Sequence, residues 1–187
     1  MKDKYLDEMK QGSKAPSSSF IMIYDDIDNE VAKQVTQYIL ETNYGPADDR
    51  PDFINMLINS QGGLLTDAFA IIDIMKSSTI PIRTIGLGQI ASAALMIFLT
   101  GDERILTPNT SIMSHIWSGG SMGKASDLFA ITKEFNLTTE RMMEHYIKHT
   151  GMTKKKINET LLTTSDVYLS AEEALKLGIC DRVAFLK

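Results

Sequence analysis

The sequence predicts a single α/β domain built around a mostly parallel sheet. Short apolar runs at residues 20–24, 53–58 and 82–87 alternate with helical periodicity at residues 30–44 and 65–75. Strands that are separated by helices are joined by right-handed crossovers and therefore run parallel. The length of 187 residues suits one buried core better than two.

The second half of the chain continues the alternation. Residues 1–19 are polar, end in a Pro-Ser-Ser-Ser run, and predict a flexible segment ahead of a domain at 20–187. Residues 170–173 read as a capping box, which opens a helix. The remaining apolar patterns predict helices at 91–100, 125–150 and 153–161, and strands at 104–106, 111–116, 167–169 and 180–185.

Composition narrows the function classes. The net charge of -5 argues against nucleic acid, whose phosphates need clustered Lys and Arg. The most apolar run, residues 90–99, has about ten residues, roughly half of a bilayer span. We therefore expect a soluble, cytoplasmic protein without a membrane partner. Cys180 is the single cysteine, so an internal disulfide cannot form.

Two strand-to-helix junctions carry candidate chemistry. Ser92 follows Gly88 and precedes an apolar helix, so its hydroxyl would lie at a helix start, where α/β sites commonly form. A plain N-cap serine is the alternative. Gly62 and Gly63 mark a second junction, where backbone N–H groups could face a developing oxyanion. An ordinary tight turn is the alternative there.

Three histidines and one aspartate are further candidates. His115 ends an apolar strand, and an imidazole there could serve as a general base. Asp166 precedes the strand at 167–169 and could orient such an imidazole, or could simply cap a turn. His145 and His149 are four residues apart on a helix, as in some metal sites, but the internal glutamate of a zinc peptidase helix is missing. A packed or solvated pair is the favoured interpretation.

The residue pattern by itself does not define a catalytic mechanism. No G-x-S-x-G elbow is present, and the chain order Ser, His, Asp differs from the chymotrypsin, subtilisin and α/β-hydrolase orders. The residues indicate an α/β domain with a candidate serine site.

Four segments resemble the proteolytic subunit of the Clp protease (ClpP). Residues 58–63 (INSQGG) are similar to the family's I-N-S-P-G-G turn, and residues 88–93 (GQIASA) to its nucleophile segment G-Q-A-A-S-M. Residues 108–115 (PNTSIMSH) resemble P-N-S-R-V-M-I-H, which ends on the catalytic histidine. Residues 166–171 (DVYLSA) resemble D-R-F-L-S-A, which begins with the triad aspartate. The likeness spans about 20–183.

The resemblance implies a serine endopeptidase that needs neither metal nor organic cofactor. Ser92, His115 and Asp166 would form the triad, and the N–H groups of Gly63 and Ala93 the oxyanion hole. The implied fold is of the ClpP/crotonase type, with repeated ββα units and a protruding handle helix. The substrate strand would bind along the handle segment, at Gly119, Gly120, Ser121 and Met122.

The implied assembly is two stacked heptameric rings, fed with unfolded polypeptide by an AAA+ unfoldase. This chain departs from the family pattern at several positions. Gln61 replaces a proline, and Ile116-Trp117 replaces Gln-Pro. Ser165 replaces an arginine that pairs across the rings. Asn55 and Leu57 stand where aromatic residues of the unfoldase-docking pocket are expected, so docking is expected to be altered.

Three other classes stay open as alternatives. A non-catalytic ring subunit would not need all three triad residues. A crotonase-type acyl-CoA enzyme would need acid and base carboxylates, and residues 86–99 contain none. A signal-peptide peptidase would use Ser and Lys with a membrane anchor, which the sequence does not indicate.

Overall fold

A seven-stranded sheet forms the centre of the molecule in the computed structural model, which describes residues 17–186. Five strands follow one another across it: β1 (Ser18–Ile23), β2 (Phe53–Ser60), β3 (Ile82–Ala91), β4 (Glu103–Leu106) and β7 (Arg182–Val183). Strand β5 (Ser111–Ser114) pairs with β3 and with β6 (Val167–Ser170). Only the β5–β6 pair is antiparallel, so the α/β class with a mostly parallel sheet is confirmed.

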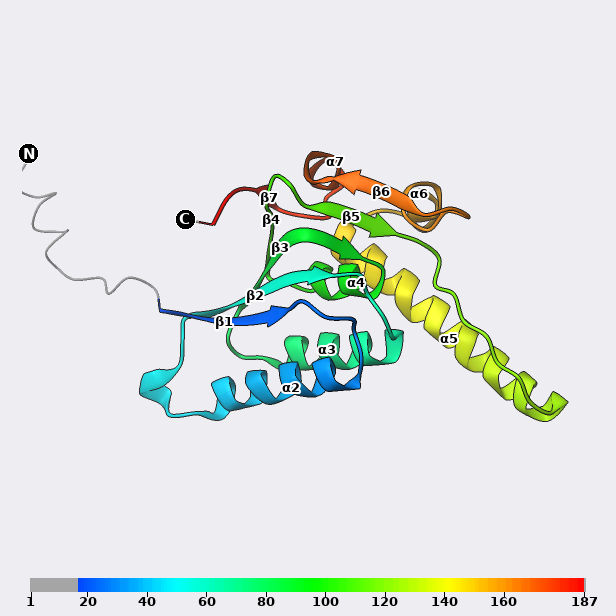
Figure 1. Ribbon diagram of the computed structural model, residues 1–187, viewed down its shortest axis with the longest axis horizontal. Helices are drawn as coiled ribbons and strands as arrows, with labels where there is room; N and C mark the ends of the chain where they lie inside the picture. The colour runs from blue at the N-terminus through cyan, green and yellow to red at the C-terminus, as the bar shows by residue number, and fades with distance from the viewer. Residues whose placement is uncertain (1–16, 187) are drawn as a thin grey trace, which may run out of the picture.

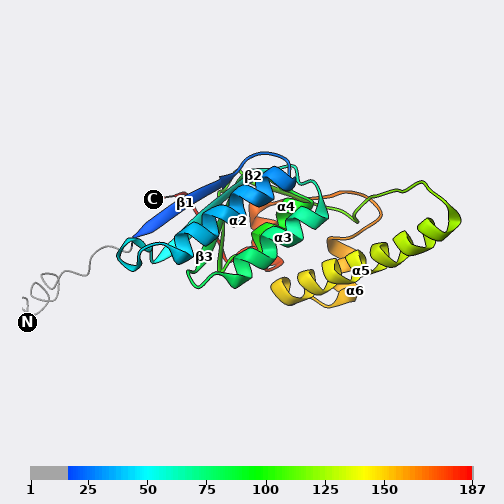
Figure 2. The same ribbon diagram turned by 90° about the horizontal axis from the view of Figure 1, so that it is seen from below.

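Helices cover the sheet mainly from one side (Figures 1 and 2). They are α2 (Asn29–Tyr44), α3 (Leu65–Ser77), α4 (Ala93–Leu99), α5 (Ala125–Thr150), α6 (Lys154–Thr160) and α7 (Ala171–Lys176), with a 3-10 turn at Ala47–Asp49. Every residue of α4 is buried, as expected for a helix that is apolar on all sides. It packs between α3, α5 and the sheet. The core therefore lies directly beneath the end of β3.

Strand β3 is longer than the sequence predicted and changes its partner midway. Its first half pairs with β4, from Arg83 to Gly86, and its second half with β5, from Gln89 to Ala91. The apolar pattern predicted a strand over residues 82–87 only. Gly88 has φ +59°, and a Cβ there would lie 2.7 Å from the Asn59 side-chain oxygen. The glycine thus lets the strand continue rather than end.

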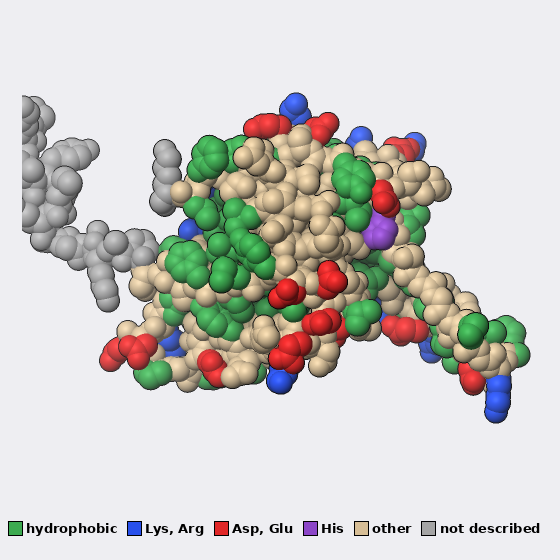
Figure 3. Space-filling model, viewed as in Figure 1, with side chains coloured by type: hydrophobic (Ala, Val, Ile, Leu, Met, Phe, Trp, Pro, Cys, Tyr) green, Lys and Arg blue, Asp and Glu red, His purple; other side chains and the backbone are tan. Residues whose placement is uncertain are grey.

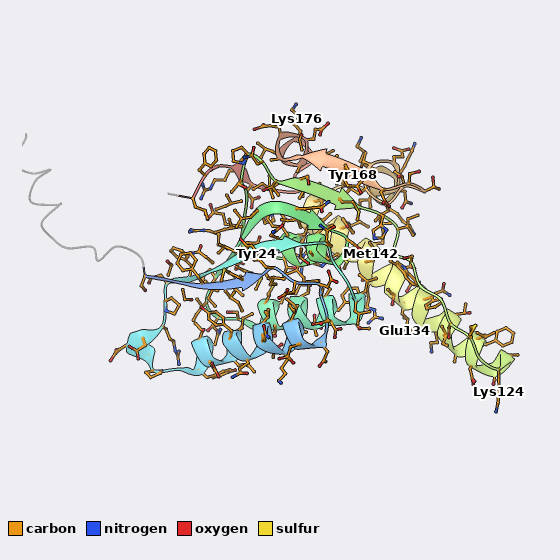
Figure 4. The ribbon with its side chains drawn as sticks, viewed as in Figure 1. Tyr24, Lys124, Glu134, Met142, Tyr168 and Lys176 are labelled. Atoms are coloured by element: carbon orange, nitrogen blue, oxygen red, sulfur yellow. The ribbon has the colours of Figure 1, made fainter. Side chains whose placement is uncertain are left out.

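Helix α5 projects from the body like a handle (Figure 1). Its four buried residues all lie in its second half: Met142, Met143, His145 and Tyr146. Figure 4 shows Glu134 between Lys124 at the tip and Met142 near the body. The long helix expected at 125–150 is confirmed, and Gly151 ends it in the left-handed conformation with φ +70°.

Several predicted boundaries shift. Ser18 and Ser19 of β1 pair with Phe53 and Ile54 of β2, so the sheet begins before residue 20. Residues 1–16 of the predicted flexible segment lie outside the described residues. Strand β5 ends at Ser114, and β7 is confined to Arg182–Val183. The predicted helix at 91–100 begins only at Ala93 because Ala91 still belongs to β3.

Candidate active site

The register of the sheet brings Ser92 and His115 together. Ala91 at the end of β3 pairs with Met113 in β5, and the N–H of Ser92 donates to the Met113 carbonyl at 2.9 Å. The residues that follow β3 and β5 therefore lie at the same edge of the sheet. The Oγ of Ser92 lies 2.7 Å from Nε2 of His115, a hydrogen-bond distance.

Ser92 has an unusual backbone. It is the one non-glycine residue between 17 and 186 with positive φ, at φ 53° and ψ -120°. It occupies the N-cap position of α4, but its side chain makes no capping hydrogen bond. Ser92 therefore lies at the helix start without capping it through its side chain, and its hydroxyl contacts His115 instead. Strained backbone of this kind is concentrated at functional sites.

Asp166 reaches the site through the antiparallel pairing of β6 with β5. Ser114 pairs with Val167, so the next residues outward, His115 and Asp166, lie opposite one another. The Nδ1 of His115 is 3.8 Å from Oδ1 of Asp166, beyond hydrogen-bond distance. Half of the Asp166 side chain (54%) is exposed. Ser92, His115 and Asp166 thus lie together, with a close contact between Ser92 and His115 and a longer one between His115 and Asp166.

The Gly62–Gly63 turn packs against the backbone of Ser92. Gly62 has φ +96°, and a Cβ there would lie 2.8 Å from the Ser92 Cβ. The N–H groups on either side of Gly63 are engaged, since Gly62 donates to the Ser60 hydroxyl and Leu64 to the Ile27 carbonyl. We find no acceptor for the N–H of Gly63 within the described chain. Ala93 is the first residue of α4, so its N–H has no partner in the helix.

A cavity of about 520 Å³ opens beside Ser92 and His115. Its walls come from the Gly63 turn, β5, the segment after His115 and the middle of α5, and include Leu64, Leu65, Met113, Trp117 and Phe135. The residues predicted to bind substrate, Gly119 to Met122, do not line it, and Met122 is 98% exposed. Trp117 and Phe135 were missed by the sequence analysis. Trp117 could have been found from the sequence, because it is an aromatic residue only two positions after His115.

His145 and His149 lie away from this cavity, at the base of α5. Their rings are 4.4 Å apart, and Nε2 of His145 contacts the Met96 carbonyl at 2.8 Å. Burial lowers the pKa of His145 to about 3 and that of His149 to about 4. Across residues 17–186 no three side chains of the metal-binding types converge on one point. The pair packs α5 onto α4.

Within the same residues, none of the helices is both long and apolar enough to cross a bilayer.

The fold and the site define an α/β protein whose paired serine and histidine have the geometry of serine hydrolases. The chain belongs to the Clp protease family, which it matches over residues 6–187. Among solved structures it is similar to a mutant form of ClpP1 from Listeria monocytogenes. The two chains are 28% identical with a TM-score of 0.78, over 90% of this chain and 92% of the other. The chain is therefore a proteolytic subunit of the ClpP type.

Proposed function

We propose that this subunit is an active serine endopeptidase that cleaves unfolded polypeptides. The observation that supports the proposal most is the 2.7 Å contact between the Ser92 hydroxyl and His115 Nε2. A nucleophile is activated when an adjacent base can take its proton, and this contact is short enough for direct transfer. The cavity beside the two residues offers room for a peptide.

The reaction would proceed by acyl transfer. His115 takes the Ser92 proton as Oγ attacks the peptide carbonyl, and the resulting imidazolium gives that proton to the leaving amine. Water then attacks the acyl-enzyme, again with His115 as base, and the carboxylic acid product leaves. Asp166, across from Nδ1 of His115, would hold the imidazole in the tautomer that leaves Nε2 free to accept.

The oxyanion of the tetrahedral intermediate would bind to the N–H groups of Gly63 and Ala93. Both groups border Ser92: Ala93 follows it in the chain, and the Gly62–Gly63 turn packs on its backbone. The missing Cβ of Gly62 is what permits this approach, because a side chain would lie 3.0 Å from the Ala93 nitrogen. Neither donor needs a metal ion or a cofactor to act.

The proposed assembly is a double ring of heptamers in the cytoplasm, joined through α5. This helix extends its first half into solvent and exposes Leu128 and Phe129, which a second copy could cover. The exposed segment from Gly119 to Met122 connects the residues after His115 to the start of α5. It could bind substrate as an added strand.

An unfoldase partner would dock on a second groove, of about 750 Å³, at the far end of the sheet. Phe20, Phe53 and Ile85 line it, and Figure 3 shows hydrophobic side chains gathered over β1 and near the C-terminal end. Asn55 also lines the groove and is 5% exposed, whereas Leu57 is not part of its lining. The Asn55 amide and the charged Arg83 and Arg182, which also line the groove, should weaken docking of an apolar loop.

Degradation of a fluorescently labelled unfolded protein tests the proposal. The wild-type assembly should release small fluorescent peptides, and the Ser92→Ala variant, assembled to the same mass, should release none. Equal release by both proteins would show that a contaminating protease acts. Release by neither, from particles of ring size, would favour the non-catalytic ring subunit. Addition of an unfoldase that stimulates a typical Clp peptidase should change the wild-type rate little, because of Asn55.

A further inference from the structure

Trp117 connects the segment after His115 to helix α5 through side-chain contacts. It follows His115 by two residues and lines the cavity together with Phe135 of α5. The indole and the Phe135 ring meet edge to face, with centroids 5.0 Å apart and planes at 64°. This arrangement is the favourable one for two aromatic rings.

Two further contacts fix the indole in place. Its Nε1–H donates to the Thr139 hydroxyl at 3.0 Å, one turn beyond Phe135 on the same helix. Gly119 also lies close to the ring, and a Cβ at Gly119 would be 2.7 Å from the indole. The indole therefore contacts both the helix and the loop, which together set its position at the cavity.

The charges around the cavity favour an apolar occupant. The lining contains Leu64, Leu65 and Met113 besides Trp117, with the uncharged polar residues Gln61, Thr66, Ser118 and Thr138, and no Lys or Arg in the described chain contributes to it. Glu134 is the acidic residue at the rim, and it already pairs with Arg141. A substrate carboxylate would find no cation here and would lose its hydration.

We propose that Trp117 is a specificity-determining residue of this subunit, against which the apolar side chain of the cleaved residue packs. The inference rests on the proposed peptidase activity. The cavity starts at Ser92, so the side chain next to the reacting carbonyl is the one placed to enter it. Because this substrate side chain contacts the indole while the bond is cleaved, the contact should raise kcat/KM.

Cleavage of two peptides that differ only in the residue before the scissile bond, Leu or Ala, tests the proposal in the assembled protein. The wild type should prefer Leu, and Trp117→Ala should lower the ratio of the two kcat/KM values roughly tenfold, the scale of a lost apolar contact. Trp117→Phe should keep most of the preference. Tyr44→Ala removes an aromatic side chain that is 82% exposed and should leave the ratio unchanged.

A binding measurement separates this inference from the catalytic proposal. Trp117 is the only tryptophan of the chain, so its fluorescence reports on the cavity directly. In the Ser92→Ala protein, the Leu peptide should shift the emission at lower concentration than the Ala peptide. Thr139→Val removes the acceptor of the indole N–H at similar volume, and should weaken that difference without unfolding the protein.

Either of two results would overturn the inference. One is an equal loss of activity on both peptides in Trp117→Ala, which would mean that the indole only supports His115. The other is a ratio of the two kcat/KM values that stays as in the wild type while activity is kept. If wild-type particles neither cleave peptide nor react with a serine-directed probe, the catalytic proposal fails and this inference fails with it. Normal probe labelling with an unchanged ratio would overturn this inference alone.

Discussion

His115 Nδ1 lies 3.8 Å from the carboxylate of Asp166, whereas its Nε2 lies 2.7 Å from the Ser92 hydroxyl. The imidazole is thus closely paired with Ser92 and loosely paired with Asp166. Catalytic hydrogen bonds are often long in free enzymes and shorten when substrate binds. The register of β5 with β6 sets the aspartate opposite the ring, and a small movement of the segment before β6 would close the gap.

The loose contact leads to a graded prediction for the triad. His115→Ala should abolish measurable peptide cleavage, since it removes the base. Asp166→Asn should lower kcat by less than the roughly 10⁴-fold seen when the aspartate of a tightly paired triad is replaced. Steady-state kinetics of both variants, in assemblies of equal mass, check the order. A larger loss in Asp166→Asn than in His115→Ala would contradict it.

Gly63 should tolerate no side chain. Its φ of +151° is unfavourable for other residues, and a Cβ would lie 2.3 Å from the Ile27 carbonyl oxygen. Gly63→Ala should lower the free energy of unfolding by about 1–3 kcal/mol and displace the N–H proposed for the oxyanion hole. Gly120→Ala is the matched control, because no atom lies within 4 Å of its added Cβ. Urea denaturation should find the control within about 0.5 kcal/mol of wild type.

Stability should fall on mild acidification because of the two histidines at the base of α5. Burial is the main cause of their low pKa values, about 3 for His145 and about 4 for His149, and the cations of Lys76 and Lys148 add to it. Below pH 6.5 the unfolded chain binds protons at these rings that the folded protein does not. The stability that the two neutral imidazoles contribute is complete above pH 6.5, and it is lost as the pH falls toward their pKa values in the folded protein.

Urea denaturation at pH 7.5, 6.0 and 5.0 measures this effect. His145, which is 5% exposed, can contribute a slope of at most about 1.4 kcal/mol per pH unit. His145→Gln should give a flatter dependence, even if its stability at pH 7.5 is reduced by the loss of the contact to Met96. An identical pH dependence in the variant would show that other groups cause the acid sensitivity.

That Ser92, His115 and the Gly62–Gly63 turn lie close together was predictable from the sequence, because these residues follow strand ends. Apolar runs before Ser92, His115 and the Gly62–Gly63 turn are readable without coordinates, and parallel pairing places such ends at one edge. The partner change within β3 was not predictable, because it depends on Gly88 meeting Asn59 of another strand. Trp117 was noted only as a departure from the family pattern. Its role depends on contacts with Phe135 and Thr139 that a single sequence does not reveal.

The most direct test of the account is labelling of the intact protein with a fluorophosphonate, which reacts only with an activated serine. We predict one adduct per wild-type subunit by mass spectrometry and none in Ser92→Ala. His115→Ala should react far more slowly, since the hydroxyl would lose the base that lies 2.7 Å away. An unlabelled wild-type protein that is folded and assembled, or an adduct that persists in Ser92→Ala, would contradict the assignment of Ser92 as the nucleophile.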